Sequence, residues 1–242
     1  MPYLAVVVPA YNEAPRVLPS LQRIREYLCG QDYTWAVTVV SDGSTDGTNE
    51  IVQEFCTSNP GFHLLAYEPN RGKGYAVRKG MLEAEGEIIL FSDADLAAPI
   101  EELDKMLKPI REGYPIAIGS RPLKESQLEV HQPFIREMFG RASNMVIQLL
   151  GVRGIHDTQC GFKIFTHEAA QEVFSRCKLN GFSFDFEALM VGHDLGLRIA
   201  EIPIRWAHQE GSKVVLWRDA PKALFDLFKL RMMGKRRRLE KS

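Results

Sequence analysis

The feature that most restricts the fold of this chain is the alternation of short apolar runs with helical stretches through its first half. Four runs rich in β-branched or aromatic residues predict strands, at residues 4–8, 36–40, 62–67 and 87–91. Their nearly continuous apolar character is typical of parallel strands that are buried on both faces. Strands that alternate with helices favour an α/β fold with a doubly wound sheet, which binds ligands at the carboxyl ends of its strands.

Helices are expected between and after these runs. In the first, apolar residues recur at helical spacing from Val17 to Leu28, and Gly30 follows as a residue that can end the helix. Pro19 falls inside this pattern, so we expect the helix to start later than Val17. The other predicted helices cover residues 47–56, 73–84, 100–111, 134–150, 167–175 and 185–195.

Composition and charge exclude several classes of protein. The 242 residues carry a formal net charge of -1, which gives no reason to expect nucleic-acid binding. The four cysteines lie far apart, which argues against a zinc knuckle or a disulfide scaffold. The N-terminus lacks the pattern of a signal peptide, and no apolar run reaches the roughly 18–20 residues of a spanning helix. We therefore expect a cytoplasmic protein.

Polar residues follow three of the four predicted strands. They occupy positions 9–13 after the first strand, 41–44 after the second and 92–95 after the fourth. All three segments contain carboxylates, and the carboxyl ends of parallel strands meet at one edge of the sheet. We therefore expect a ligand site at this edge.

Asp93 and Asp95 come just after the fourth run, behind Ser92. Two carboxylates at i and i+2 can hold a hard cation, and Mg²⁺ or Mn²⁺ would keep waters and take diphosphate oxygens as its other ligands. Such an ion neutralises the charge that develops on a departing nucleoside diphosphate. A turn with an Asp helix cap before Pro99 is the alternative, but the neighbouring acidic strand ends favour the metal.

Two further segments have both a structural and a functional interpretation. Residues 41–47 suit a simple turn, but Asp42 can also accept hydrogen bonds from a nucleobase or ribose. The glycine pattern of dinucleotide-binding proteins is absent, which disfavours a nicotinamide oxidoreductase. Residues 70–74, taken alone, suit the start of a helix, but Lys73 with the helix N-terminus can also meet a phosphate.

Together these residues resemble glycosyltransferase family 2, inverting enzymes of the GT-A fold that use a nucleotide-sugar donor. The resemblance implies a Rossmann-like, doubly wound mixed sheet with helices on both faces. The family often has Asp where Ser41 stands, whereas its nucleotide-contacting Asp matches Asp42. The matching segments are VVVPAYNE (6–13), VVSDGSTDGT (39–48), NRGKGYAVRKG (70–80) and FSDADLAAP (91–99).

The second half is similar to the dolichyl-phosphate β-glucosyltransferases of this family, which use UDP-glucose and a lipid-phosphate acceptor. Their close relatives, the polyprenyl-phosphate mannosyltransferases, use GDP-mannose. The resemblance implies a glycosyltransferase domain over 1–215, with a nucleotide-binding half (1–100) and an acceptor half (101–215), followed by a tail (216–242). The segments that carry it are GSR (119–121), DTQCGFKIF (157–165), FSFDFEAL (182–189) and EIPIRWAHQEGSKV (201–214).

The resemblance also implies roles for individual residues. Asp93 and Asp95 hold the metal and the diphosphate, and Arg121 and Arg136 grip the acceptor phosphate; we take these four as catalytic. The donor site comprises these two aspartates with Pro9, Tyr11, Glu13, Asp42, Lys73, Ala94 and Lys213.

Three positions or segments depart from the family pattern. Ala97 stands where the mannosyltransferases have a metal-binding Gln, and His208 replaces an Arg. Both differences favour the glucosyl branch. The N-terminal membrane helix of the eukaryotic glucosyltransferases has no counterpart in this sequence, which leaves the acceptor open.

The type of acceptor decides whether a base is needed. A lipid phosphate is already ionised, so orientation and electrostatic stabilisation suffice. A hydroxyl acceptor requires a carboxylate to take its proton, and Asp157, Asp185 and Glu187 are the candidates. These three carboxylates can equally be helix caps or ion-pair partners. The alternatives to a glucosyltransferase are a GDP-mannose enzyme, a transferase to a hydroxyl, and an inactive sugar-nucleotide-binding protein.

The C-terminal segment 220–242 combines apolar and basic residues. Residues 222–242 carry eight Lys or Arg and two acidic residues. An amphipathic helix with a basic end can lie in the headgroup layer of a membrane. The alternatives are a helix packed on the domain with a solvated tail, and a dimer contact.

Overall fold

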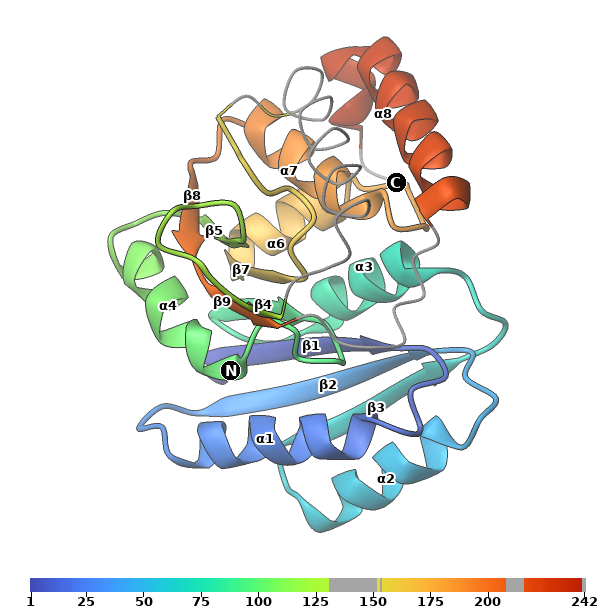
Figure 1. The fold of residues 1–242 in the computed structure, drawn as a ribbon, viewed down its shortest axis with the longest axis vertical. Helices are drawn as coiled ribbons and strands as arrows, with labels where there is room; N and C mark the ends of the chain where they lie inside the picture. Colours follow the sequence, from blue (N-terminus) through green and yellow to red (C-terminus); the bar gives the residue numbers. More distant parts are fainter. Residues whose placement is uncertain (131–151, 153, 208–215, 241–242) are drawn as a thin grey trace.

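The structure is a computed structural model that describes residues 1–130, 152, 154–207 and 216–240. A mixed sheet of seven strands lies at its centre, in the order β3-β2-β1-β4-β7-β5-β8 (Figure 1). Strands β1 to β4 are mutually parallel, β7 is antiparallel to both β4 and β5, and β8 is parallel to β5. The strands are β1 (Leu4–Ala10), β2 (Trp35–Asp42), β3 (Phe62–Tyr67), β4 (Ile88–Ser92), β5 (Ile116–Ser120), β7 (Phe162–Thr166) and β8 (Ile199–Pro203). A second, two-stranded sheet pairs β6 (Gln127–Val130) with β9 (Arg205–Ala207).

Helices cover both faces of the large sheet. Helices α1 and α2 lie on one side, and α3, α6 and α7 lie on the other (Figure 1). The helices are α1 (Val17–Cys29), α2 (Thr48–Ser58), α3 (Lys73–Glu83), α4 (Leu103–Arg111), α6 (His167–Phe174), α7 (Phe184–Asp194) and α8 (Leu216–Arg238), and a short 3₁₀ helix, η1 (Ile100–Glu102), precedes α4. The predicted doubly wound mixed sheet is therefore confirmed.

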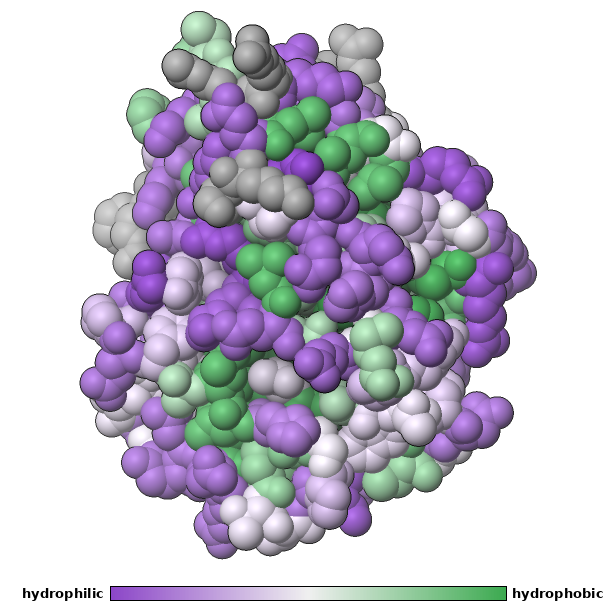
Figure 2. All heavy atoms as spheres, turned by 180° about the vertical axis from the view of Figure 1, so that it is seen from behind, coloured by the Kyte–Doolittle hydropathy of each residue, from purple (hydrophilic) through white to green (hydrophobic). Residues whose placement is uncertain are grey.

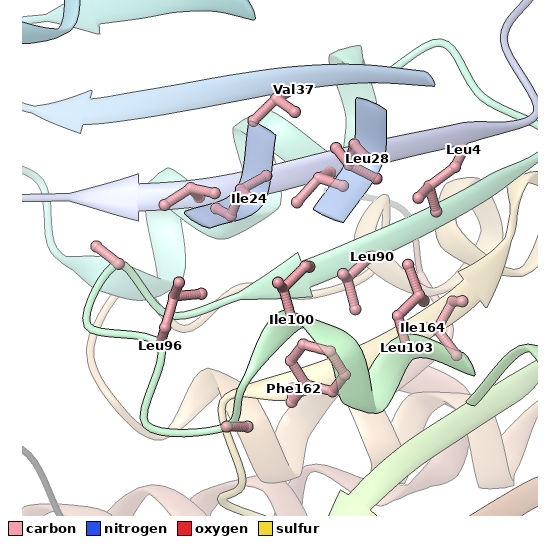
Figure 3. Close-up of a cluster of buried hydrophobic side chains, with 14 of the residues drawn as sticks. Leu4, Ile24, Leu28, Val37, Leu90, Leu96, Ile100, Leu103, Phe162 and Ile164 are labelled. Carbon is pink, nitrogen blue, oxygen red and sulfur yellow. The ribbon is translucent and has the colours of Figure 1, made fainter. Parts of the chain in front are cut away.

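The alternation of side chains along β1 explains why two cores form. Leu4, Val6 and Val8 point into the core beneath α1, whereas Ala5 and Val7 point into the core beneath α3. Because both faces of the strand are buried, the run is apolar throughout, as in parallel sheets generally. Figure 3 shows the first core, to which α1 contributes Ile24 and Leu28 and β1 contributes Leu4, and where Phe162 of β7 lies near Ile100 of η1.

The expected delay of the first helix by Pro19 is wrong. Helix α1 begins at Val17, so Pro19 lies in its first turn. Backbone N–H groups of a first turn have no partner within the helix, so a proline there removes no helical hydrogen bond. Gly30 ends the helix as predicted, and its N–H donates to the carbonyl of Tyr27 at 3.2 Å. The predicted helix at 134–150 lies outside the described residues.

Helix α8 packs on the second core. Leu227 and Leu230 are 0% and 3% exposed and belong to the cluster that α3, α6 and α7 also line. The helical backbone breaks at Gly234, whose φ of 74° lies in the left-handed region. In the described part of the chain, no helix is both long enough and apolar enough to cross a membrane. On the face opposite to that of Figure 1, hydrophobic residues form separate groups among hydrophilic ones (Figure 2).

Candidate active site

The loops that follow β1 and β2 are bonded to each other at the carboxyl edge of the sheet. The N–H of Asn12 donates to Ser44 Oγ at 3.0 Å, and its side-chain oxygen accepts from the N–H of Thr45 at 2.8 Å. The N–H of Glu13 donates to Thr48 Oγ1 at 2.8 Å. Asn12 has a φ of 50°, an uncommon value for a residue other than glycine. Since β4 is the other neighbour of β1, the three polar strand ends lie side by side as predicted.

Asp93 lies directly against the backbone of Gly161. Its N–H donates to the Gly161 carbonyl at 3.0 Å, and a Cβ at Gly161 would overlap the Asp93 carboxylate. On its other side, the ammonium of Lys73 lies 2.6 Å from Asp93 Oδ1. The side chains of Asp93 and Lys73 are 30% and 25% exposed, so this ion pair faces solvent in part. Only glycine at position 161 leaves room for the carboxylate in this place.

Asp95 lies in the tight turn after Asp93. Asp95 Oδ1 accepts from the N–H of Ala97 at 3.1 Å. Leu96, between them, has a φ of 47° while its side chain is 6% exposed in the first core (Figure 3). Backbone held in this region costs of order 1–3 kcal/mol and persists where the surroundings impose it. The buried Leu96 side chain anchors the turn that carries both carboxylates.

The carboxylates of Asp93 and Asp95 repel each other. Burial raises the pKa of Asp95, and the charge of Asp93 raises it further, against the opposing effects of the Ala97 N–H, Lys73 and Arg16. A divalent cation between the two carboxylates would offset both the burial of the Asp95 charge and its repulsion by Asp93. Within the described ranges, no group of three or more His, Cys, Asp and Glu side chains forms a metal site. The pair fits Mg²⁺ or Mn²⁺, which take oxygen ligands and use waters and phosphates to complete their coordination.

Asp42 is 2% exposed and binds the segment that leads to Lys73. One carboxylate oxygen accepts from the Tyr67 hydroxyl at 2.9 Å and the Arg71 N–H at 2.7 Å. The other accepts from the Asn70 side chain at 2.9 Å and the Gly72 N–H at 2.8 Å. A contact between Asp42 and a nucleotide stays a prediction, but its role in holding residues 70–72 is evident from these bonds.

Arg16 is a site residue that sequence reasoning missed. Its guanidinium donates to both carboxylate oxygens of Glu13, and this raises the pKa of Arg16; Asp95 and Asp93 contribute through their charge. Arg16 therefore places positive charge near the aspartate pair. The only signal in the sequence is a basic residue three positions after an acidic one in a loop, which is too common to identify a site.

The other predicted donor residues that the structure describes lie at the same edge. Pro9 pairs with Val40 in the register of β1 and β2, and Tyr11 follows at 39% exposure. Ala94, between the two aspartates, is 6% exposed. A small hollow beside Asp93 is also lined by Gly161. Arg136, His208 and Lys213 lie outside the described residues.

Arg121 forms a two-point ion pair with Asp157. Its Nε and Nη2 donate to the two carboxylate oxygens at 2.6 and 2.9 Å, and its backbone N–H donates to Oδ2 at 3.1 Å. Burial alone would raise the pKa of Asp157, but the charge and hydrogen bonds of Arg121, together with the charge of Lys163, outweigh burial and the pKa is lowered. The Arg121 side chain is 29% exposed and lies near the Trp206 ring. Binding of an acceptor phosphate by Arg121 stays a prediction.

The other two candidate bases are also engaged. Asp185 pairs with the ammonium of Lys163, which is 1% exposed and donates as well to the Cys160 carbonyl at 2.6 Å. Glu187 accepts from the backbone N–H groups of Lys178 and Leu179 at 2.9 and 2.8 Å. Burial raises the pKa of Asp185 despite Lys163, and that of Glu187 despite its two backbone donors.

A comparison with known families identifies the chain. The model of glycosyl transferase family 2 matches residues 5–174, which include the Asp93 turn and the Gly161 segment. The chain belongs to glycosyltransferase family 2. The resemblance read from the sequence is therefore confirmed.

Several proteins with similar sequences are named dolichyl-phosphate β-glucosyltransferases. One from Trichomonas vaginalis is 38% identical over 224 residues, covering 88% of this chain and 68% of the relative. The human protein is 35% identical over 225 residues, covering 88% and 69%, and that of Saccharomyces cerevisiae is 33% identical over 249 residues, covering 95% and 74%. The chain thus spans about two thirds to three quarters of the length of these relatives.

Solved structures confirm the GT-A fold. Mannosyl-3-phosphoglycerate synthase from Rubrobacter xylanophilus matches with a TM-score of 0.72 at 18% identity, covering 96% of this chain and 74% of that one. Glucosyl-3-phosphoglycerate synthase from Mycobacterium tuberculosis, in complex with Mn²⁺, UDP-glucose and phosphoglyceric acid, matches with a TM-score of 0.73 at 18% identity, covering 96% and 81%. At these identities the likeness concerns the fold.

Proposed function

We propose that this family 2 glycosyltransferase transfers glucose from UDP-glucose to a polyprenyl phosphate of the dolichyl type, with inversion at the anomeric carbon. Residues 1–100 bind the nucleotide sugar, and residues 101–215 bind the acceptor. The names of the related proteins support both the sugar and the acceptor class. Asp93 and Asp95 would hold Mg²⁺ or Mn²⁺, which would supply positive charge to the leaving diphosphate.

The observation that carries this proposal is that all three candidate bases are buried and already have hydrogen-bond or ion-pair partners. Asp157, Asp185 and Glu187 are 2%, 5% and 1% exposed, and each is paired with a cation or with backbone N–H groups. A general base must reach the proton that it removes. A phosphate oxygen is already ionised and needs no base, so a phosphate acceptor fits this site better than a hydroxyl does.

Residues of the chain itself then orient the two substrates and stabilise their negative charge. Lys73 lies next to Asp93 on the donor side, where its ammonium can approach a diphosphate oxygen. Arg121, together with Arg136, holds the acceptor phosphate, since the planar guanidinium binds phosphate at two points. The alternatives are a GDP-mannose enzyme, a transferase to a hydroxyl and an inactive sugar-nucleotide-binding protein. The intact pair of Asp93 and Asp95 disfavours the inactive protein.

The choice of donor is tested by thermal unfolding with nucleotides. With Mn²⁺ present, we expect UDP to raise the melting temperature and GDP to leave it nearly unchanged. A ligand at 100 times its Kd adds about 2.7 kcal/mol to the free energy of unfolding. ADP serves as the control for a nonspecific diphosphate effect. Stabilisation by GDP and none by UDP would show that the donor assignment is wrong.

We further propose that the enzyme works from the cytoplasmic side and reaches its lipid through the outer face of α8. The exposed residues Phe225, Phe228 and Met232 follow helical spacing and are 67%, 60% and 71% exposed. Exposed Lys229 and Lys235 add positive charge to the same helix. Leu227 and Leu230 already pack on the core, so core packing uses one face and leaves the other uncovered. An apolar face flanked by basic residues fits an anionic lipid surface.

The membrane contact is tested by vesicle sedimentation. Removing the three large apolar side chains with Phe225→Ser, Phe228→Ser and Met232→Ser should reduce binding to vesicles rich in phosphatidylserine by about tenfold or more. Leu18→Ser, at a 38% exposed leucine on α1, is the matched control and should bind as the wild type does. Unchanged vesicle binding by the triple variant would exclude this face. If the wild type is a dimer and the triple variant is a monomer, this face binds a second copy of the chain instead of a membrane.

A further inference from the structure

Lys73 is held from both sides through the backbone of its neighbours. On one side, the Asp42 carboxylate accepts from the N–H groups of Arg71 and Gly72. On the other side, the carbonyl of Asn180 accepts from the N–H of Gly74 at 2.8 Å and that of Tyr75 at 3.3 Å. Lys73, the first residue of α3, therefore has little freedom to move along the sheet edge.

The second contact comes from residues 177–181, which we name the α7-approach loop. It lies so close to α3 that side chains at two positions are excluded. A Cβ at Gly72 would overlap the Asn180 carbonyl oxygen, and one at Gly74 would lie 2.5 Å from the Leu179 carbonyl oxygen. The glycines flanking Lys73 thus permit the contact with this loop, in addition to the conformation that the φ of 99° at Gly72 requires.

The position of the α7-approach loop is in turn fixed by Glu187. The carboxylate is 1% exposed, and its two oxygens accept separately from the consecutive N–H groups of Lys178 and Leu179. Arg78 of α3 adds two bonds, from Nη1 to the Cys177 carbonyl and from Nη2 to Asn180 Oδ1, both at 3.0 Å. A buried carboxylate that receives such bonds is expensive to leave unpaired, so it holds its donors firmly.

We propose that Glu187 is a positioning residue for the donor site, which acts through the α7-approach loop to keep Lys73 beside Asp93. The inference rests on the proposed function in one respect, that Lys73 meets the donor diphosphate. In this proposal, Glu187 itself makes no contact with the substrate. Its effect on donor binding therefore depends on the presence of the Lys73 ammonium.

A double-mutant cycle tests this dependence. The variants are Glu187→Gln, Lys73→Met and their combination, and the readout is the Kd of UDP with Mn²⁺ by calorimetry. Glutamine fills the same volume but offers one acceptor for two N–H groups. Glu187→Gln should weaken UDP binding about tenfold in the wild-type background and less than about twofold in the Lys73→Met background. Glu83→Gln, at an exposed carboxylate of α3 paired with Lys79, is the control and should change nothing.

Arg78→Met is a second way to weaken the contact between α3 and the α7-approach loop. Arg78 is less buried than Glu187, and its loss should leave the fold intact while loosening the α7-approach loop. It should show the same dependence on Lys73, so the test stands even where Glu187→Gln does not fold. Equal effects in both backgrounds, or UDP binding unaffected by either variant, would overturn the inference. A wild-type protein that binds neither UDP nor UDP-glucose would instead overturn the proposed donor.

Discussion

An Asp95→Asn enzyme should keep its fold and lose nearly all sugar transfer. The amide fills the same space and can still accept from the Ala97 N–H, so the turn should survive the change. What is lost is one of the two anionic oxygen ligands that we propose for the cation at the leaving diphosphate. An electrostatic contribution of about 4 kcal/mol corresponds to roughly a thousandfold in rate. The measurement is transfer from UDP-glucose to a short polyprenyl phosphate.

Two comparisons separate this effect from a change in stability. The neutral side chain should raise the melting temperature slightly or leave it unchanged, because burial and the Asp93 charge oppose ionisation of Asp95. Asp32→Asn, at an exposed loop carboxylate, should retain full activity. EDTA should inactivate the wild type, and Mn²⁺ or Mg²⁺ should restore it. Full activity in EDTA, or of Asp95→Asn, would refute the metal assignment.

Strands β1 and β4 could be predicted because they are buried on both faces and are therefore apolar throughout. Strands β2 and β3 are only partly buried and were visible as runs rich in β-branched or aromatic residues. The strands of the second half carry weaker signals. Strand β7 contains Lys163 at a buried position, and all five residues of β8 are only half-buried. A lysine inside a five-residue run suggests an exposed segment and not a buried strand. Only its ion pair with Asp185, 22 residues later, explains why Lys163 is buried.

In the candidate site, too, some features could be predicted from local sequence patterns and others could not. The meeting of the Asp93 turn with the other strand ends followed from the geometry of parallel sheets. The neighbours of Asp93 did not, because Lys73 and Gly161 come from elements distant in the sequence. Asp157, Asp185 and Glu187 looked like candidate bases as long as their partners were unknown. The structure pairs Asp157 with Arg121, Asp185 with Lys163, and Glu187 with two backbone N–H groups, which fits the alternative of ion pairs and caps. No local pattern in the sequence identified these partners.

The second large effect is expected at the buried ion pair of Arg121 and Asp157. Arg121→Met should lower the free energy of unfolding by about 3 kcal/mol, because it leaves the Asp157 carboxylate, 3% exposed, without its cation. Arg23→Met, which breaks an exposed pair with Glu101, should cost less than about 1 kcal/mol and is the control. Chemical denaturation at pH 7 measures both differences.

The loss of unfolding free energy caused by Arg121→Met should also depend on pH, in a definite direction. The pKa of Asp157 is lowered in the folded wild type, so the pair contributes stability above the unfolded pKa of about 3.9 and loses it as pH falls through the folded value. The difference between wild type and variant should therefore be largest near neutrality and shrink as the pH falls, because protonation of Asp157 removes the uncompensated charge in the variant and the ion pair in the wild type. A deficit that is constant with pH would mean that lost packing, rather than lost charge, causes it.

A second substitution separates the structural role of Arg121 from its proposed contact with the acceptor. Adding Asp157→Asn to Arg121→Met removes the uncompensated charge, so much of the lost stability should return. Transfer activity should stay low, because the guanidinium that we propose to meet the acceptor phosphate is still missing, while UDP binding should be close to that of the wild type. If activity returned together with stability, Arg121 would serve only to neutralise Asp157, and the acceptor phosphate would have to be held by other residues.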